Sequence, residues 1–131
     1  MARLIVLDAS VAIAALAADD AHHGAASAAL ATTTDDELVV PATTRAEIMV
    51  GPSRVGDAAF ATARDFVDGC ATVPVTASIA DEAASLRARH RALSLPDAIA
   101  LVVANLIDAD AVWTLDRRWS DLDPRVTIPP P

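Results

Sequence analysis

The chain has 131 residues, a formal net charge of −8 at pH 7 and a sequence pI near 4.5. That length fits one domain, which we expect to span residues 1–131. The acidity argues against a protein that binds nucleic acid by charge alone, because phosphate binding usually leaves a basic footprint. The single cysteine, Cys70, excludes an internal disulfide and a cysteine-based metal site, and it suits the reducing cytoplasm.

The first apolar segment, residues 4–7, predicts a short buried strand, and an Ala-rich helix follows over residues 10–18. Arg3, this apolar stretch and the small residues 15–17 imitate a signal peptide, but Asp8 interrupts the apolar region and argues against one. No uninterrupted apolar run reaches the length of a transmembrane helix, so we expect no membrane association.

A second helix is expected over residues 22–31, and the polar residues 32–36 separate it from a strand at 37–40. Pro41 ends that strand. Thr43 or Thr44 can cap the next helix, which we expect to run to about Val50. The segment Gly51-Pro52-Ser53 should end it.

The spacing of Phe60, Ala63 and Val67 predicts a helix over residues 57–68. Residues 72–75 read as a third strand, and Pro74 favours an edge position for it because proline cannot donate to a sheet ladder. The third strand is followed by two further helices, two further strands and a turn, expected at residues 78–91, 94–107, 111–115, 117–122 and 126–128. Strands that alternate with helices predict an α/β fold with a mostly parallel sheet of four to five short strands.

Four carboxylates lie where an expected strand ends or an expected helix begins. Asp8 and Asp116 follow strands, and Glu47 and Asp97 lie in the first turns of helices. In an open α/β sheet the carboxyl ends of the strands form the ligand-binding edge. Four acids gathered there would repel one another unless a cation joined them, and carboxylate oxygens suit a hard divalent cation. This pattern indicates a metal site and hydrolysis of phosphodiester bonds.

Each acid also has an ordinary structural explanation. Asp8 and Asp116 can cap the helical segments that follow them, and Thr44-Arg45-Ala46-Glu47 fits a capping box. Asp97 lies where the helix dipole favours an acid. The alternatives remain open for each residue singly, and the set of four at one edge favours the metal site.

The residues around these acids match a known family. The segments that carry the likeness occur in the family's order and spacing: Val6-Leu7-Asp8-Ala9-Ser10-Val11, Ala46-Glu47-Ile48, Leu95-Pro96-Asp97-Ala98-Ile99-Ala100 and Trp113-Thr114-Leu115-Asp116. Over nearly its whole length the chain resembles a PIN domain, and within that superfamily it is similar to the VapC-type toxin ribonucleases of bacterial toxin–antitoxin pairs.

This resemblance implies a three-layer α/β/α fold and a metal-dependent endoribonuclease that inhibits translation and growth. Asp8, Glu47, Asp97 and Asp116 would be the catalytic residues and would hold Mg²⁺ or Mn²⁺, with Asp8 and Asp97 as the strongest candidates for direct ligands. Asp116 would act through water, and Glu47 would bind the metal or orient a water. The products would carry a 5′-phosphate and a 3′-hydroxyl.

Supporting roles are weaker expectations. Ser10 and Thr114 can hydrogen-bond the carboxylates or the phosphate, or can be ordinary capping hydroxyls. Arg117 and Arg118 can hold RNA phosphate, or can belong to a solvated turn. The histidines are expected on the surface, and Trp113 and Trp119 are expected in the core, with a dimer contact or base stacking as the other roles open to Trp119.

The resemblance also implies partners. Members are usually homodimers that assemble with a cognate VapB-like antitoxin into a heterotetramer or larger complex in the cytoplasm. The helices expected over residues 10–31 and 57–68 can form the antitoxin groove or a dimer face, or can pack only on their own sheet.

Three rival functions are weighed against the toxin. A PIN nuclease of housekeeping RNA processing, outside any toxin–antitoxin pair, and a non-catalytic PIN scaffold that binds RNA or protein both remain open. Phosphoryl transfer through an aspartate is disfavoured, because such enzymes use a lysine and this chain has none. The haloacid-dehalogenase type also needs a second acid two residues after the first, where this chain has Ser10.

Overall fold

The structure is a computed structural model that describes residues 2–131. Its centre is a five-stranded sheet in the order β3-β2-β1-β4-β5, and every neighbouring pair is parallel. The strands are β1 (Leu4–Leu7), β2 (Glu37–Pro41), β3 (Ala71–Val73), β4 (Ala111–Trp113) and β5 (Val126–Thr127). The prediction of an α/β fold with a parallel sheet is confirmed.

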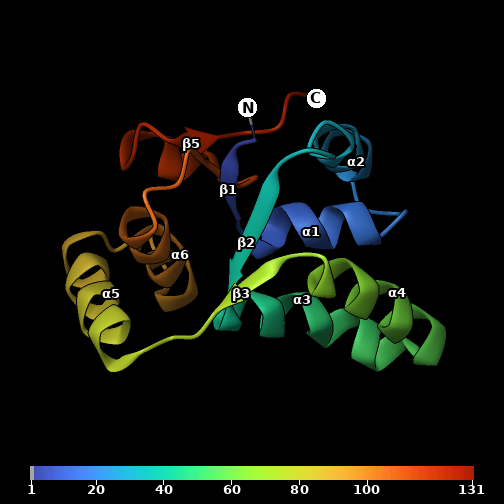
Figure 1. The fold of residues 1–131 in the computed structure, drawn as a ribbon, viewed down its shortest axis with the longest axis horizontal. Coiled ribbons are helices and arrows are strands. Elements are labelled where there is room, and N and C mark those ends of the chain that lie inside the picture. Colours follow the sequence, from blue (N-terminus) through green and yellow to red (C-terminus); the bar gives the residue numbers. More distant parts are fainter. Residues whose placement is uncertain (1) are drawn as a thin grey trace.

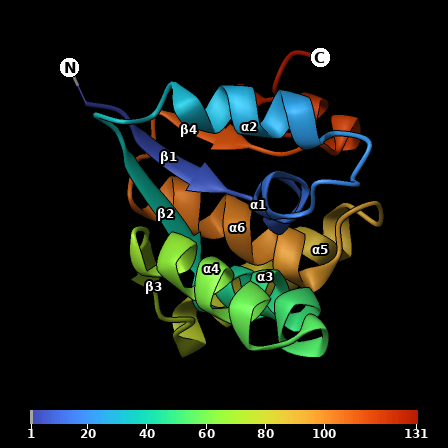
Figure 2. The ribbon, with the colours of Figure 1, turned by 90° about the vertical axis from the view of Figure 1, so that its right-hand side faces the viewer.

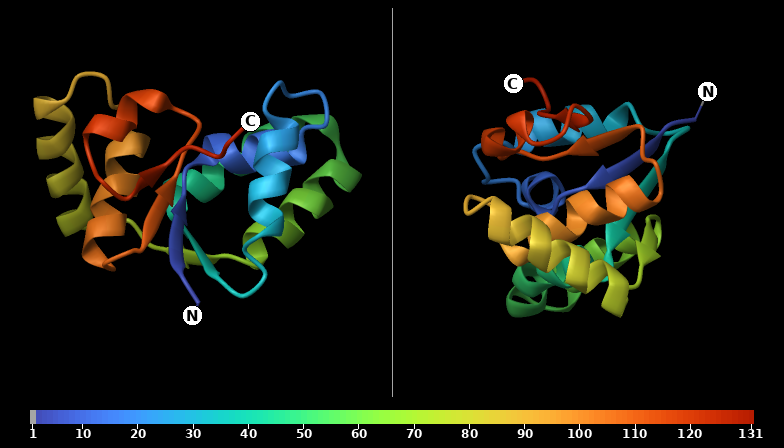
Figure 3. Two further views of the ribbon diagram at one scale, coloured as in Figure 1. Left: turned by 90° about the horizontal axis from the view of Figure 1, so that it is seen from above. Right: turned by 90° about the vertical axis from the view of Figure 1, so that its left-hand side faces the viewer.

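Helices cover both faces of the sheet, which gives three layers (Figures 1 and 3). The helical segments are α1 (Ala9–Leu16), α2 (His23–Ala31), α3 (Ala42–Val55), α4 (Asp57–Asp68), α5 (Ala77–Arg89), α6 (Leu95–Leu106) and the short 3₁₀ helix η1 (Arg117–Asp121). The first four lie on one side, and α5 and α6 pack together on the other side (Figure 1).

Alternation along β1 divides the core between the two layers. Ile5 and Leu7 are fully buried against α1 to α4, and Val6 is fully buried in the cluster built around α6. Successive strand residues point to opposite faces, so a strand covered on both sides must be apolar throughout. The uninterrupted apolar run of β1 therefore marks it as the central strand of the sheet.

Both edges of the sheet are short strands. β3 is one edge strand, as Pro74 predicted, but it ends at Val73, directly before that proline and not at residue 75, and the two-residue β5 is the other edge. Short edge strands limit further pairing with other chains. Residues 9–31 form two helices before β2, as the sequence predicted.

The predicted bounds of α3 were wrong at both ends. The helix begins at Ala42, directly after Pro41, and continues through Pro52 to Val55. Ser53 Oγ donates to the carbonyl of Met49 at 2.6 Å, which supplies a contact in the turn that proline weakens. The stop is Gly56, whose φ of 144° favours glycine.

The sheet has one topological switch point. The chain runs from β1 to β2 and β3 on one side, and then returns to β4 and β5 on the other side of β1. Ligands in open α/β sheets bind outside the carboxyl ends of the strands where the order reverses. In this molecule that place is the end of β1 and β4, toward which the β1 arrow points in Figure 2.

Candidate active site

Asp8 follows β1 at the switch point, and its residue is only 9% exposed. Its backbone N–H donates to the carbonyl of Trp113 at 2.8 Å, which continues the ladder between β1 and β4. Its carboxylate oxygen Oδ2 accepts from Ser10 Oγ at 2.6 Å and from Thr114 Oγ1 at 2.9 Å. Burying a carboxylate is tolerable only with such partners, and these two bonds hold the group in one orientation.

The two hydroxyl groups are themselves oriented by the chain after β4. Thr114 Oγ1 accepts from the backbone N–H of Asp116 at 3.1 Å, and Ser10 Oγ accepts from that of Leu115 at 3.1 Å. Each hydroxyl therefore accepts from the backbone and donates to Asp8. Among residues 2–131 no donor approaches Oδ1 of Asp8, so this oxygen is the one available to a ligand.

Asp97 lies in the first turn of α6 and completes a capping box with Ser94. Oδ2 of Asp97 accepts from the backbone N–H of Ser94 at 3.2 Å, and the backbone N–H of Asp97 donates to Ser94 Oγ at 3.2 Å. Partial burial raises the pKa of Asp97, the Ser94 hydrogen bonds lower it, and the negative charges of Asp8 and Asp116 raise it further.

Glu47 lies one turn inside α3, beyond the position where a cap could act, because the helix begins at Ala42. The residue is exposed overall, yet the protein around its carboxyl group removes enough water to raise its pKa. The charges of Asp8 and Asp97 raise that pKa as well. Three carboxylates from β1, α3 and α6 are thus near enough to repel one another.

Asp116 is the N-cap of η1 and is held by Arg118. Its Oδ1 accepts from the backbone N–H and from Nε of Arg118, both at 3.0 Å, and its Oδ2 accepts from Nη2 at 2.7 Å. The Arg118 guanidinium holds the pKa of Asp116 below its usual range.

The structural explanations for the acids separate into two groups. Asp8 makes no side-chain cap to α1, and Glu47 belongs to no capping box, so neither residue has the local role that its position suggested. Asp97 does take part in the capping of α6, the helix in whose first turn it lies, and Asp116 caps η1, which follows it. A capping carboxylate has two oxygens, and the one cap on Asp97 engages Oδ2 alone.

The donor set fits a hard divalent cation. It consists of carboxylate oxygens on rigid elements at one edge, and burial first and repulsion between them second raise the pKa of Glu47 and Asp97. Within residues 2–131, no three His, Cys, Asp or Glu side chains are close enough together to coordinate an ion as they stand.

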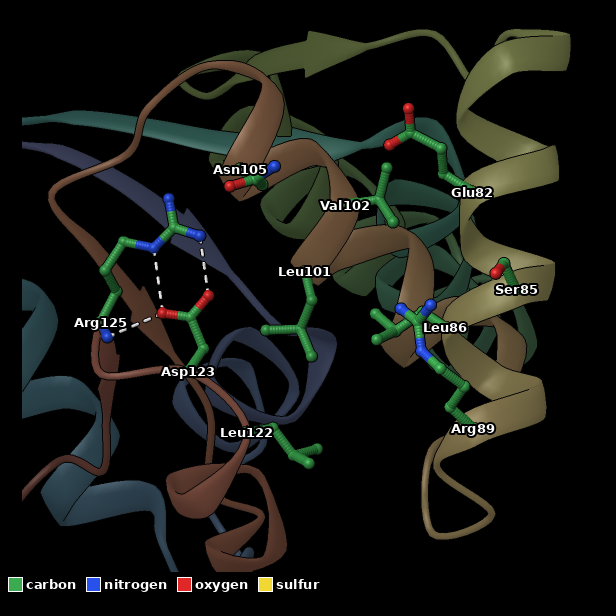
Figure 4. A pocket seen from close by; sticks show the side chains of 10 residues that line it. All are labelled: Glu82, Ser85, Leu86, Arg89, Leu101, Val102, Asn105, Leu122, Asp123 and Arg125. Atoms are coloured by element: carbon green, nitrogen blue, oxygen red, sulfur yellow. Dashed lines mark hydrogen bonds and ion pairs between the residues drawn. The ribbon is translucent and has the colours of Figure 1, made fainter.

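A large apolar groove of about 680 Å³ begins beside Glu47. It lies between α1, α3 and α4, and several of its apolar side chains are well exposed, namely Ile13, Val50 and Val55. A second hollow of about 380 Å³ lies between α5, α6 and the segment before β5 (Figure 4). Its rim is charged, with Glu82 and Arg89 on α5, and none of the four acids lines it.

Packing and contacts between helices account for His23, Trp113 and Trp119. His23 Nδ1 lies 2.9 Å from the carbonyl of Ala14 and ties α2 to α1. Trp113 and Trp119 are both buried, as expected. The indole Nε1 of Trp119 has no hydrogen-bond partner among the described residues. None of the helices formed by residues 2–131 has the length and apolar character needed to span a membrane.

The family model of the PIN domain matches residues 5–124, which is most of the chain. No curated protein has a significantly similar sequence.

Solved structures share the fold at low identity. VapC20 of Mycobacterium tuberculosis, described as a sarcin-ricin loop cleaving toxin, has a TM-score of 0.78 and 23% identity, over 90% of this chain and 94% of that one. A toxin–antitoxin complex from Klebsiella pneumoniae has a TM-score of 0.80 and 22% identity, over 96% and 98% of the two chains. FitAB bound to an IR36 DNA fragment has a TM-score of 0.77 and 18% identity, over 95% and 94%.

Proposed function

Because this chain belongs to the PIN domain family, we propose that it is a metal-dependent endoribonuclease and the toxin of a VapBC-type toxin–antitoxin pair. The observation that carries the proposal is Asp8, a buried carboxylate at the β1/β4 switch point with one oxygen fixed by two hydroxyls and the other open. A purely structural aspartate at a helix start would cap that helix, and Asp8 does not.

Asp8, Asp97 and Glu47 would hold Mg²⁺ or Mn²⁺, and Asp116 would join them through water. When bound, the cation would lower the pKa of a water and stabilise charge on the scissile phosphate. The chain's own contribution is orientation. Ser10 and Thr114 fix the Asp8 carboxylate through Oδ2, and Ser94 fixes that of Asp97 through Oδ2, so that Oδ1 of each accepts no hydrogen bond within residues 2–131.

An RNA substrate is supported by the distribution of arginines. Five of the ten are in ion pairs within residues 2–131. Of the other five, Arg89 and Arg91 lie at the end of α5 and in the loop to α6, and Arg117 begins η1. Both segments lie at the end of the molecule that holds the acids (Figure 2). Guanidinium groups that have no ion pair within residues 2–131, carried by segments at the same end of the molecule as the acids, suit a phosphate backbone.

The toxin assignment is supported by the groove beside Glu47. Its exposed apolar side chains on α1 and α3 form a surface of the kind that an amphipathic segment covers. An antitoxin segment seated there would reach the acids directly, and the solved complexes with the same fold are consistent with such a partner. The cytoplasm is the compartment that we expect for the pair.

Cleavage of total bacterial RNA by the purified, antitoxin-free protein tests the function. We expect discrete fragments with Mg²⁺ or Mn²⁺, none with EDTA, and none from Asp97→Asn. Asp81→Asn, an exposed acid on α5 away from the site, is the matched control and should cleave normally. An Asp97→Asn protein that cleaves as well as the wild type with metal present would overturn the assignment.

A further inference from the structure

The Asp116 carboxylate is engaged on both oxygens by one side chain. Arg118 Nε lies 3.0 Å from Oδ1 and 3.2 Å from Oδ2, and its Nη2 lies 2.7 Å from Oδ2. The guanidinium occupies a lone pair on each oxygen, and the backbone N–H of Arg118 occupies a further one on Oδ1. Among residues 2–131, Asp116 is the one proposed site acid that has a counter-ion in the structure.

The ion pair is linked to Asp8 by the chain after β4. The backbone N–H of Asp116 donates to Thr114 Oγ1 at 3.1 Å, and Thr114 Oγ1 donates to Oδ2 of Asp8 at 2.9 Å. The guanidinium of Arg118 therefore brings a positive charge to a segment that is hydrogen-bonded to the buried site acid Asp8.

A second Asp-x-Arg turn in the same chain, formed by Asp123 and Arg125, is a less exposed ion pair with which the first can be compared. Arg125 engages Asp123 with the same pattern, Nε to Oδ1 at 3.0 Å and Nη2 to Oδ2 at 2.7 Å (Figure 4). Arg125 also donates to the carbonyl of Ala104 at 2.9 Å, and its side chain is 21% exposed. Arg118 is 66% exposed and bonds only Asp116 among the described residues, so its pair can open to solvent.

Another donor lies beside Asp116. The indole Nε1 of Trp119 is buried without a partner among residues 2–131, and Trp119 is near enough to contribute to the lowered pKa of Asp116. A buried unpaired N–H costs free energy. The carboxylate of Asp116, once released by Arg118, can accept this hydrogen bond.

We propose that Arg118 is a positioning residue that acts through Asp116 as the internal counter-ion of the site, so that a divalent cation binds only by displacing it. Displacement frees the Arg118 guanidinium for a phosphate of the RNA and lets Asp116 turn toward the cation and Trp119. This inference rests on the proposed metal site. It adds that Arg118 and the cation compete for the carboxylate of Asp116.

Titration with Mn²⁺ alone, followed by calorimetry, measures the competition. Arg118→Gln should bind Mn²⁺ about twofold to fivefold more tightly than Arg117→Gln, since exposed ion pairs are weak. Arg117 is the matched control, because it is the neighbouring residue, has the same charge and has no ion pair within residues 2–131. Equal Mn²⁺ affinity of the two variants, both folded by circular dichroism, would overturn the proposal.

Nuclear magnetic resonance of arginine side chains reports on the Arg118 guanidinium itself, and a change in overall stability would not alter that signal. Saturating Mg²⁺ should shift the Nε–H signal of Arg118 in the wild-type protein and leave that of Arg125, in the matching pair, unchanged. An unmoved Arg118 signal in a protein that binds Mg²⁺ would overturn the proposal and leave the proposed function intact. If neither the wild type nor Arg118→Gln binds either cation, both fail together.

Discussion

Thr114 is the residue on which the geometry around Asp8 depends most. Its side chain is fully buried, donates to Asp8 and accepts from the backbone of Asp116, and so joins the ends of β1 and β4. Among the supporting residues named from the sequence, Thr114 and Ser10 contact Asp8 directly, whereas Arg118 contacts Asp116 and Arg117 contacts none of the acids by hydrogen bond or ion pair within residues 2–131.

Thr114→Val keeps the shape of the side chain and removes the hydroxyl. We expect the free energy of unfolding to fall by about 1–3 kcal/mol, because a buried carboxylate and a backbone N–H each lose a partner. Thr114→Ser, which keeps the hydroxyl and loses a methyl group, should cost about 1 kcal/mol. Urea denaturation measures both. A valine variant as stable as the wild type would mean that the hydroxyl does not support Asp8.

At the scale of single residues, the sequence predicts where each acid lies in the fold better than it predicts which side chains bond that acid. Asp8 follows β1 directly, as predicted, whereas β4 ends at Trp113, two residues before its predicted end, so that Thr114 and Leu115 separate it from Asp116. The capping box proposed for Glu47 is wrong, because the N-cap of α3 is Pro41, three residues before Thr44. The clamp of Arg118 on Asp116 was not expected, since a local turn and rotamer choice decide it.

At the scale of elements, α3 and its end carry the clearest difference from expectation. The sequence Gly51-Pro52-Ser53 carries the residues that usually end a helix, yet the helix continues to Val55 and only Gly56 stops it. The extra turn extends the apolar groove beside Glu47, because Val55 lines that groove. Tertiary packing of α3 against α1 and α4 outweighs the local preference.

Gly56→Ala should lower the free energy of unfolding by about 1–3 kcal/mol, because its φ of 144° is strained for any residue with a Cβ. Gly24→Ala is the matched control. Gly24 lies in α2 with open space around the position of a Cβ, so alanine there should stabilise the protein by about 0.5–1 kcal/mol. Thermal denaturation of both variants checks the pair, and a Gly56→Ala protein with unchanged stability would contradict the strain.

At the scale of the whole molecule, the buried and mutually repelling carboxylates of the proposed site lower the free energy of unfolding, and a bound cation would reduce this effect. Burial and mutual repulsion raise the pKa of Glu47 and Asp97 in the folded protein. Between their ordinary and raised pKa values the folded protein holds protons that the unfolded chain has released. The free energy of unfolding contributed by these two groups therefore falls as pH rises through that window.

The variant Glu47→Gln/Asp97→Asn removes both charges and keeps an acceptor for the Ser94 N–H. Without added metal we expect it to be more stable than the wild type at pH 7.5, with the difference shrinking to zero as pH falls below the ordinary carboxyl range. Urea denaturation at several pH values measures this. A double variant less stable than the wild type at pH 7.5 would show that the carboxylates stabilise the metal-free fold.

The overall architecture follows from the sequence more completely than the site does. Alternation of short apolar strands with helices determines a parallel sheet, and the position of Pro74 agrees with an edge strand. The sequence pattern leaves the strand order open. That order places the ends of β1 and β4 side by side, which makes Asp8 and Thr114 neighbours although they are 106 residues apart.

Carboxylates that follow β1 and β4 and lie within α3 and in the first turn of α6 form the proposed site for a divalent cation. Calorimetric titration of the wild type, Asp8→Asn and the control Asp81→Asn with Mn²⁺ tests this site. We expect the wild type and Asp81→Asn to bind with the same affinity and Asp8→Asn, still folded, to lose binding by at least about tenfold. Unchanged Mn²⁺ affinity in Asp8→Asn would contradict the site.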